Sequence, residues 1–304
     1  MDLSVVIPLY NEESLAEELV KRTLSSVTPL TPEFEIIFVD DGSTDQTVNL
    51  LMQARSAERR IKILVLSKNF GHQAAFTAGL KHASGSCVVM LDGDLEDPPE
   101  LIPQLYRMIK EGQWDVVSGK RSGAGEQRRR LVNHLFHKLF RRASGFGDLE
   151  NAGHFSAMNR QALEAILSFR ETIRYLPGLR KLIGFRQGFI EYSRSPRKSG
   201  RSKMTTSRLI NLGSDAIFSF SNLPVKICLY LGLAGILVFF GAGLYTLVAK
   251  IAGFAIPGWS STLLSIYFLG SIQLTFMGIL GEYVYRIYKE SQQRPIYFVK
   301  EFHQ

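Results

Sequence analysis

The sequence contains very little cysteine and no group of cysteines and histidines with zinc-binding spacing. Only Cys87 and Cys228 occur among 304 residues, and each lies in an apolar run, as buried and unreactive thiols do. A disulfide scaffold and a structural zinc site are therefore excluded. The glycine patterns GxGxxG and GxxxxGK[ST] are also missing, which disfavours a dinucleotide-dependent oxidoreductase and a P-loop NTPase.

The N-terminus lacks a charged region followed by an apolar run and a cleavage site, so we expect no signal peptide. Hydrophobic residues make up 45% of the chain and charged residues 21%, which excludes a disordered or low-complexity protein. A chain of this length is predicted to form about two domains.

Net positive charge is confined to two blocks of the chain. The net charge is +8 overall, +7 within residues 120–142, +6 within 186–226 and −5 in the remainder. No helix-turn-helix, zinc-finger or RNA-recognition pattern accompanies these blocks, so we expect no nucleic-acid partner. The second block ends where an apolar run begins, and such an arrangement suits anionic lipid headgroups and phosphate-bearing substrates.

Two uncharged apolar runs near the C-terminus predict a hairpin of transmembrane helices. The first helix is expected at 223–250, around the 23 uncharged residues 227–249, and the second at 259–281. Lys and Arg flank the pair, and only Lys250 lies between the runs. The positive-inside rule then predicts a multi-pass membrane protein with the N-terminal domain and both termini in the cytoplasm. If the source is a bacterium, this membrane is expected to be the cell inner membrane. A pair of buried core helices is the alternative.

The first 120 residues alternate between short apolar runs and helical patterns. Strands are predicted at 3–7, 35–39, 61–66, 87–91 and 115–118, and helices at about 12–27, 45–57, 72–83 and 99–111. This alternation predicts an α/β, Rossmann-like fold with a mostly parallel sheet and helices on both faces. Ligands of such sheets bind beyond the carboxyl ends of the strands.

Carboxylates follow two of these predicted strands. Asp92 and Asp94 come directly after the fourth strand, where they could hold Mg²⁺ or Mn²⁺ and leave positions open for diphosphate oxygens, and Glu96 extends this acidic set. Asp40 and Asp41 follow the second strand; that stretch is also interpretable as a turn with a helix cap at its end. Solvated loop acids are the alternative for the first group.

The motifs VVIPLYNEE, VDDGSTD, NFGHQAAFTAG and MLDGDLEDPPE, in this order on the predicted strand ends, resemble those of family 2 glycosyltransferases with the GT-A fold. Together with the two apolar runs and the C-terminal GEYVYRIYKES and RPIYFV, the layout is similar to that of polyprenyl-phosphate glycosyltransferases of the dolichol-phosphate-mannose-synthase and bactoprenol-glucosyltransferase types. The resemblance covers nearly the whole chain. It implies a hexosyltransferase that moves a sugar from a UDP-glucose-like or GDP-mannose-like donor to polyprenyl phosphate at the cytoplasmic membrane face, with Mg²⁺ or Mn²⁺ as cofactor. In-line attack by the phosphate implies inversion at the anomeric carbon.

The resemblance also implies roles for individual residues. The residues expected to bind the nucleotide-sugar are Pro8, Tyr10, Glu12, Asp40, Asp41, Lys68, Asp92 and Asp94, and those expected to hold the metal are Asp92, Asp94 and Glu96. Asp94 is expected to be catalytic. So are cations that would bind phosphate, namely Arg130 and, within SRSPRKSGRSKM, Arg194, Arg197 and Lys203.

One segment departs from the family pattern. Residues 151–156 read NAGHFS, where the family usually has D/N-x-G-D-F-R, so His154 replaces an acid and Ser156 an arginine. His154 is therefore an uncertain contact to acceptor or sugar, and a drifted loop or weak catalysis is the alternative.

We expect a cytoplasmic glycosyltransferase domain over 1–204 that includes an interfacial helix at about 130–142, where a leucine stripe faces one side. An ordinary amphipathic surface helix packed on the sheet is the alternative for this stretch. A juxtamembrane amphipathic helix is expected at 205–222 and a cytoplasmic tail at 282–304. Membrane lipid and, from the resemblance, further copies of the chain are the expected partners. A processive polysaccharide synthase is an alternative, although neither Trp114 nor Trp259 stands in its QxxRW motif. A catalytically weak nucleotide-sugar-binding membrane protein is another.

Overall fold

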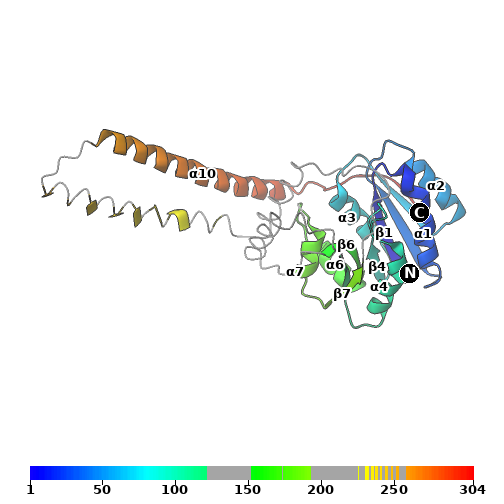
Figure 1. The fold of residues 1–304 in the computed structure, drawn as a ribbon. Helices are drawn as coiled ribbons and strands as arrows, with labels where there is room; N and C mark the ends of the chain where they lie inside the picture. The colour runs from blue at the N-terminus through cyan, green and yellow to red at the C-terminus, as the bar shows by residue number, and fades with distance from the viewer. Residues whose placement is uncertain are drawn as a thin grey trace. The chain divides into compact units, whose positions relative to one another are not determined.

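A computed structural model describes residues 1–121, 152–172, 174–192 and 258–304, with isolated positions between 225 and 252. The chain divides into two compact units (Figure 1). The first comprises Met1–His137, Gly147–Lys203 and Arg294–Gln304, and the second comprises Lys138–Phe146 and Met204–Gln293.

The described part of the first unit is built on an eight-stranded sheet in the order β7-β5-β6-β4-β1-β2-β3-β8. Four of these strands, β3, β2, β1 and β4, are mutually parallel; β6 runs antiparallel to β4 and β5, β7 runs parallel to β5, and β8 runs antiparallel to β3. The strands are β1 (Leu3–Leu9), β2 (Phe34–Asp40), β3 (Ile61–Leu66), β4 (Cys87–Met90), β5 (Val116–Arg121), β6 (Ala152–Asn159), β7 (Gln187–Tyr192) and β8 (Val299–His303). The prediction of a mostly parallel α/β sheet is confirmed.

Helices cover both faces of this sheet, because the central strands are apolar on both sides. Every residue of β1 and β2 is buried. Val5 and Ile7 point into one core cluster with side chains of α1, α2 and α4, whereas Val6 points into the other with side chains of α3, α6 and α7. The helices are α1 (Glu13–Val27), α2 (Thr47–Ala57), α3 (His72–His82), α4 (Ile102–Lys110), α6 (Arg160–Ser168) and α7 (Leu176–Leu182), with a 3₁₀ turn η1 (Pro99–Leu101) before α4.

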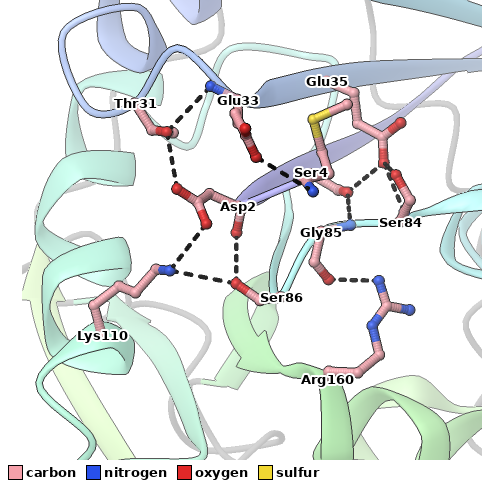
Figure 2. Close-up of polar contacts among 11 residues, drawn as sticks. Asp2, Ser4, Thr31, Glu33, Glu35, Ser84, Gly85, Ser86, Lys110 and Arg160 are labelled. Atoms are coloured by element: carbon pink, nitrogen blue, oxygen red, sulfur yellow. Dashed lines mark hydrogen bonds and ion pairs between the residues drawn. The ribbon is translucent and has the colours of Figure 1, made fainter.

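A buried carboxylate, Glu35, joins the parallel strands at the ends where they begin (Figure 2). Glu35 is fully buried and accepts hydrogen bonds from the hydroxyl of Ser4 at 2.5 Å and from the amide and hydroxyl of Ser84 at 2.7 and 2.8 Å. Its other oxygen pairs with Nζ of Lys62 at 2.6 Å. Burial alone would raise the pKa of Glu35, but the bonds from Lys62, Ser4 and Ser84 outweigh it and lower that pKa. Glu35 therefore joins β1, β2 and β3 to the segment before β4 at the ends where these strands begin.

The C-terminal part of the chain contributes one long helix and the last strand. Helix α10 (Trp259–Ser291) covers the second predicted span and continues past its expected end. Residues 282–304, which we expected to form only a cytoplasmic tail, also supply β8, the outermost strand beside β3 in the sheet of the first unit. Among the helices that the structure describes, none combines the length and the apolar composition needed to cross a membrane. Most of the first predicted span, and all of the helices expected at 130–142 and 205–222, lie outside the described residues.

Candidate active site

The loops after β1 and β2 are joined by side chains at the carboxyl ends of these strands. Asn11 has a positive φ of 52°, a conformation that Asn tolerates better than most residues. Its amide donates to the hydroxyl of Ser43 at 2.9 Å, and its side-chain oxygen accepts from the amide of Thr44 at 2.8 Å. The amide of Glu12 donates to the hydroxyl of Thr47 at 3.0 Å. The half-buried side chains of Tyr10 and Glu12 are thereby held beside the end of β2.

Asp40 and Asp41 are buried, and both carboxylates hold loop backbone. Asp40 accepts from the amides of Gly42 and Ser43 at 3.2 and 3.0 Å. Asp41 accepts from the amides of Phe70 and Gly71, in the loop after β3, at 2.7 and 2.9 Å. Burial raises the pKa of both carboxyls, although these amide bonds oppose the shift. Asp41 therefore fixes the third loop to the second.

Glycine permits the close approach of these loops. Gly42 has φ +74°, and a Cβ at this position would lie 2.6 Å from the carbonyl carbon of Lys68. A Cβ on Gly93, in the loop after β4, would lie 2.5 Å from Cδ2 of Leu9 and 2.7 Å from the carbonyl oxygen of Pro8. Both glycines are thus required where one strand end packs directly against another.

The loop after β4 contains a strained residue, Leu95, between Asp94 and Glu96. Leu95 adopts φ 57°, which is costly for a bulky side chain, while its side chain is buried in the core. The buried side chain of Leu95 therefore holds the backbone of Asp94 and Glu96 in place. Asp94 accepts from the amide of Glu96 at 3.1 Å, and Asp94 is half-buried whereas Glu96 is buried.

Asp92 lies between two imidazoles, one from α3 and one from β6. Nε2 of His72 is 2.9 Å from Oδ1 of Asp92, and Nδ1 of His154 is 3.9 Å from Oδ2. The ring of His154 also stacks on Phe76 at 5.4 Å and meets His72 edge-on at 4.8 Å. Burial would lower the pKa of His72, but the bond to Asp92 and the charges of Asp94 and Asp41 outweigh it and raise that pKa.

Gln73 determines which nitrogen of His154 carries the proton. The amide of Leu176, the first residue of α7, donates to Oε1 of Gln73 at 3.1 Å. The NH₂ group of Gln73 is thereby left facing Nε2 of His154 at 2.6 Å. Because an NH₂ donor needs a lone pair as its acceptor, neutral His154 carries its proton on Nδ1, the nitrogen that faces Asp92.

Arg180 is a buried cation beneath the same site. It is only 2% exposed, and its Nη2 donates to the carbonyl oxygen of Gly153, next to His154, at 2.5 Å. Within the described part of the chain, Nη1 has no hydrogen-bond partner. Burial lowers the pKa of Arg180 to about 10, and the charge of Asp92 opposes this shift, so the guanidinium remains charged at neutral pH.

The family of the chain follows from this architecture together with comparison to known proteins. A family model described as glycosyl transferase family 2 matches residues 4–167. The chain belongs to this family. A bactoprenol glucosyl transferase of Shigella phage SfV is 36% identical over 99% of this chain and 98% of its own length. An uncharacterized glycosyltransferase of Synechocystis is 39% identical over 99% of this chain and 95% of its own.

Solved structures show the same GT-A fold in other glycosyltransferases. The mannosyltransferase PcManGT of Pyrobaculum calidifontis, in complex with GDP-Man and Mn²⁺, superposes with a TM-score of 0.50 at 17% identity, over 97% of this chain and 84% of that one. Glucosyl-3-phosphoglycerate synthase of Mycobacterium tuberculosis, in complex with Mn²⁺, UDP and glucosyl-3-phosphoglycerate, superposes with a TM-score of 0.51 at 18% identity, over 72% of this chain and 78% of that one. These structures confirm the α/β fold, and the match to glycosyl transferase family 2 makes the protein a glycosyltransferase.

The structure places many of the predicted site residues of this glycosyltransferase at one edge of the sheet. Those at the ends of β1 to β4 are Pro8, Tyr10, Glu12, Asp40, Asp41, Lys68, Asp92, Asp94 and Glu96. Lys68 is exposed and lies over the ring of Phe70 at 5.2 Å. The four cations predicted to bind phosphate, Arg130, Arg194, Arg197 and Lys203, fall outside the described residues.

Sequence reasoning did not identify His72, Gln73 and Arg180 as site residues. His72 and Gln73 stand in the NFGHQ motif that follows the third strand, so their position in the motif was a usable signal. Arg180 lies in α7, far along the chain from the motifs, and no pattern in the sequence connects it with Asp92.

The carboxylates and imidazoles fit a divalent cation. Donor atoms of His72, Asp92 and His154 lie within 4.8 Å of one another, and the charge of Asp94 acts on His72. Carboxylate and imidazole ligands together suit Mn²⁺, and carboxylates alone suit Mg²⁺. Gln73 leaves the proton of neutral His154 on Nδ1, the nitrogen that faces Asp92 at 3.9 Å, so in this tautomer that nitrogen offers no lone pair to a metal.

Proposed function

We propose that the protein transfers a hexose from a nucleotide-diphospho-sugar, UDP-glucose-like or GDP-mannose-like, to a polyprenyl phosphate at the cytoplasmic face of a membrane, with inversion at the anomeric carbon. The observation that carries this proposal is the convergence of four strand ends on one edge, with Asp92 and Asp94 in the last loop. The full-length similarity to a protein named bactoprenol glucosyl transferase supports the choice of acceptor.

On the donor side, Asp92 and Asp94 would hold Mg²⁺ or Mn²⁺, and Glu96 would be a further ligand of the metal. A cation there supplies charge neutralisation to a departing nucleoside diphosphate. The residues proposed to line the nucleotide pocket are Pro8, Tyr10, Glu12, Asp40, Asp41 and Lys68. Because the carboxylates of Asp40 and Asp41 hold loop backbone, we propose that they act by shaping the pocket.

On the acceptor side, a phosphate monoester has a second pKa near 6 and is mostly dianionic at pH 7. It needs less help from a general base than a hydroxyl acceptor would. A neutral His154 in the place of the family acid is compatible with such chemistry, because the acceptor needs no proton removed; Nδ1 of His154 lies 3.9 Å from Oδ2 of Asp92. We propose that Arg130, Arg194, Arg197 and Lys203 bind the acceptor phosphate through charge-assisted hydrogen bonds.

We further propose that two helices, near 223–250 and 259–281, anchor the enzyme in the membrane, with 1–204 and both termini in the cytoplasm. The sheet supports this topology. Because β1 and β8 belong to one sheet, the chain between them must cross a membrane an even number of times. Apolar side chains along α10 support it too, since Ile266, Leu274 and Met277 are at least 58% exposed. Self-association into a homo-oligomer is part of the same proposal.

The test uses the full-length protein in detergent with undecaprenyl phosphate and either UDP-[¹⁴C]glucose or GDP-[¹⁴C]mannose, with Mn²⁺ or Mg²⁺. We expect metal-dependent transfer of label from one of these donors into the organic phase, as a product that mild acid hydrolyses. A parallel reaction with dephosphorylated polyprenol should give no product. Labelled product with polyprenol, or labelled polymer that remains in the aqueous phase, would contradict the proposed acceptor.

A further inference from the structure

The C-terminal segment Tyr297–His303 lies against the loop that follows β3. Strand β8 pairs with β3 from Ile63↔His303 to Leu66↔Val299, with a register shift between Val65 and Leu66. Pairing then continues beyond the ladder, because the amide of Ser67 donates to the carbonyl oxygen of Phe298 at 2.9 Å. The end of the chain thus reaches the first residue of a loop that belongs to the candidate active site.

Side chains extend this contact further into the loop. The ring centroids of Phe298 and Phe70 are 6.1 Å apart, with the ring planes at 51°. The amide of Phe70 donates to Asp41 at 2.7 Å. The loop is therefore held by the carboxylate of Asp41 through its backbone and by Phe298 through its side chain.

Other contacts anchor the C-terminal segment independently of this loop. Nζ of Lys81 lies 5.6 Å from the ring centroid of Tyr297, and the ring of Phe302 is 4.8 Å from that of His82. Arg55 donates to the carbonyl oxygen of Gln304. Tyr297 and Phe302 also pack against the core cluster on the α3 side of the sheet. The segment therefore has its own support and can act as a fixed surface for the loop.

We infer that Phe298 is a positioning residue for the nucleotide-sugar donor. Phe298 fixes residues 67–71 and so determines the position of Lys68 and of the amides that donate to Asp41. In this way β8 and the residues beside it influence the donor site. This inference rests on the proposed function for the identity of the ligand. Only residues 292–296 separate α10 from this segment, so the chain that directly follows the long helix acts on donor binding through the loop after β3.

The experiment compares full-length Phe298→Ala with the wild type and with Phe298→Tyr, which keeps the ring. Hydrogen exchange at the amides of Ser67, Phe70 and Gly71 is measured without nucleotide, and the affinities for UDP and for GDP are then measured with Mn²⁺. An aromatic pair contributes enough to predict a roughly two- to tenfold loss of nucleotide affinity in Phe298→Ala. We also expect faster exchange at the three amides, and wild-type behaviour for Phe298→Tyr.

Phe302→Ala is the matched control, because it removes a ring from the same strand that contacts His82 and not the loop. We expect it to lower the melting temperature and leave exchange at Phe70 and Gly71 unchanged. Unchanged exchange in Phe298→Ala, or equal losses of nucleotide affinity in Phe298→Ala and Phe302→Ala, would overturn the inference. If exchange accelerates as expected but the wild type binds neither nucleotide, the loop contact stands and the proposed function fails.

Discussion

At the scale of single residues, the site is organised around the carboxylate of Asp92 and the side chains that surround it. Asp92 is placed between His72 and His154, and the tautomer of His154 is set by Gln73, whose own orientation is set by the backbone amide of Leu176. Three of these contacts, His72 with Asp92, Gln73 with His154 and Leu176 with Gln73, are hydrogen bonds with one donor and one acceptor each. A single isosteric substitution can therefore reverse one of them.

Replacing Asp94 by Asn removes one proposed metal-binding carboxylate and preserves the shape of the loop. We expect sugar transfer to fall by about 100-fold or more, since the loss of a metal ligand removes several kcal/mol of transition-state stabilisation. The rate of product formation and the melting temperature are to be measured together. Glu111→Gln, at an exposed acid away from the site, is the control. A variant that keeps more than about one tenth of the wild-type rate would rule out the metal role.

Gln73→Glu should move the proton of His154. A carboxylate can still accept from the amide of Leu176, but it presents an acceptor to Nε2 of His154, so Nε2–H becomes the favoured tautomer. The ¹⁵N chemical shifts of His154 in histidine-labelled protein report the tautomer directly. Gln73→Met, which offers neither donor nor acceptor, should leave the Leu176 amide unsatisfied and cost about 1–3 kcal/mol of stability. Nε2–H already present in the wild type would show the assignment to be wrong.

At the scale of elements, the polar groups at the two ends of the parallel strands make different contacts. Where the strands begin, Glu35, Ser4 and Ser84 connect β2, β1 and the segment before β4 through fully formed hydrogen bonds (Figure 2). Where the strands end, Asp41 and Gly93 join loops instead, and the strained Leu95 lies between two acids. Buried polar groups thus hold strands together where the strands begin, and hold loops together where the strands end.

Glu35→Gln should destabilise the protein and weaken its acid sensitivity. The pKa of Glu35 is lowered in the folded state, so its contribution is present above the ordinary glutamate pKa of about 4.3 and is lost as pH falls through the lower folded value. At pH 7 the variant loses an ionic partner of Lys62, which we expect to cost about 1–3 kcal/mol. Urea unfolding across this pH range measures both effects. The exposed Glu33→Gln is the control, and an equal loss in both variants would contradict the assignment.

At the scale of the whole molecule, the chain begins and ends in one sheet. Strands β1 and β8 both belong to the first unit, although α10 and the rest of the second unit lie between them in sequence. Any membrane attachment of the second unit therefore has to return the chain to the side from which it left.

Cysteine labelling tests this topology. In a background with Cys228→Ala, and with Cys87 buried, Ser260→Cys should react with a membrane-impermeant maleimide added to intact cells, whereas Ser291→Cys should react only after lysis. Permeabilised cells serve as the control for both positions. Reaction of Ser291→Cys from outside would contradict the shared side of the two termini, and protection of Ser260→Cys would contradict the hairpin.

Local periodicity and motif order in the sequence determined the core of the fold. The strands at 3–7 and 61–66 and the helix at 72–83 were predicted to within a few residues, because a buried parallel strand and an amphipathic helix each leave a local pattern. The order of the motifs also determined which polar residues reach the edge of the sheet, since the carboxyl ends of parallel strands meet there.

Tertiary structure alone decided the pairings between distant segments. Strand β8 is short and carries three polar residues among its five, so its addition to β3 depends on an available sheet edge and on contacts such as that of Phe302 with His82. Arg180 reaches Gly153 only because α7 packs beside β6, and Asp41 binds the third loop only because glycine at position 42 lets it approach. A sequence pattern records the environment of one segment. Contacts between distant segments are set by packing, which no local pattern contains.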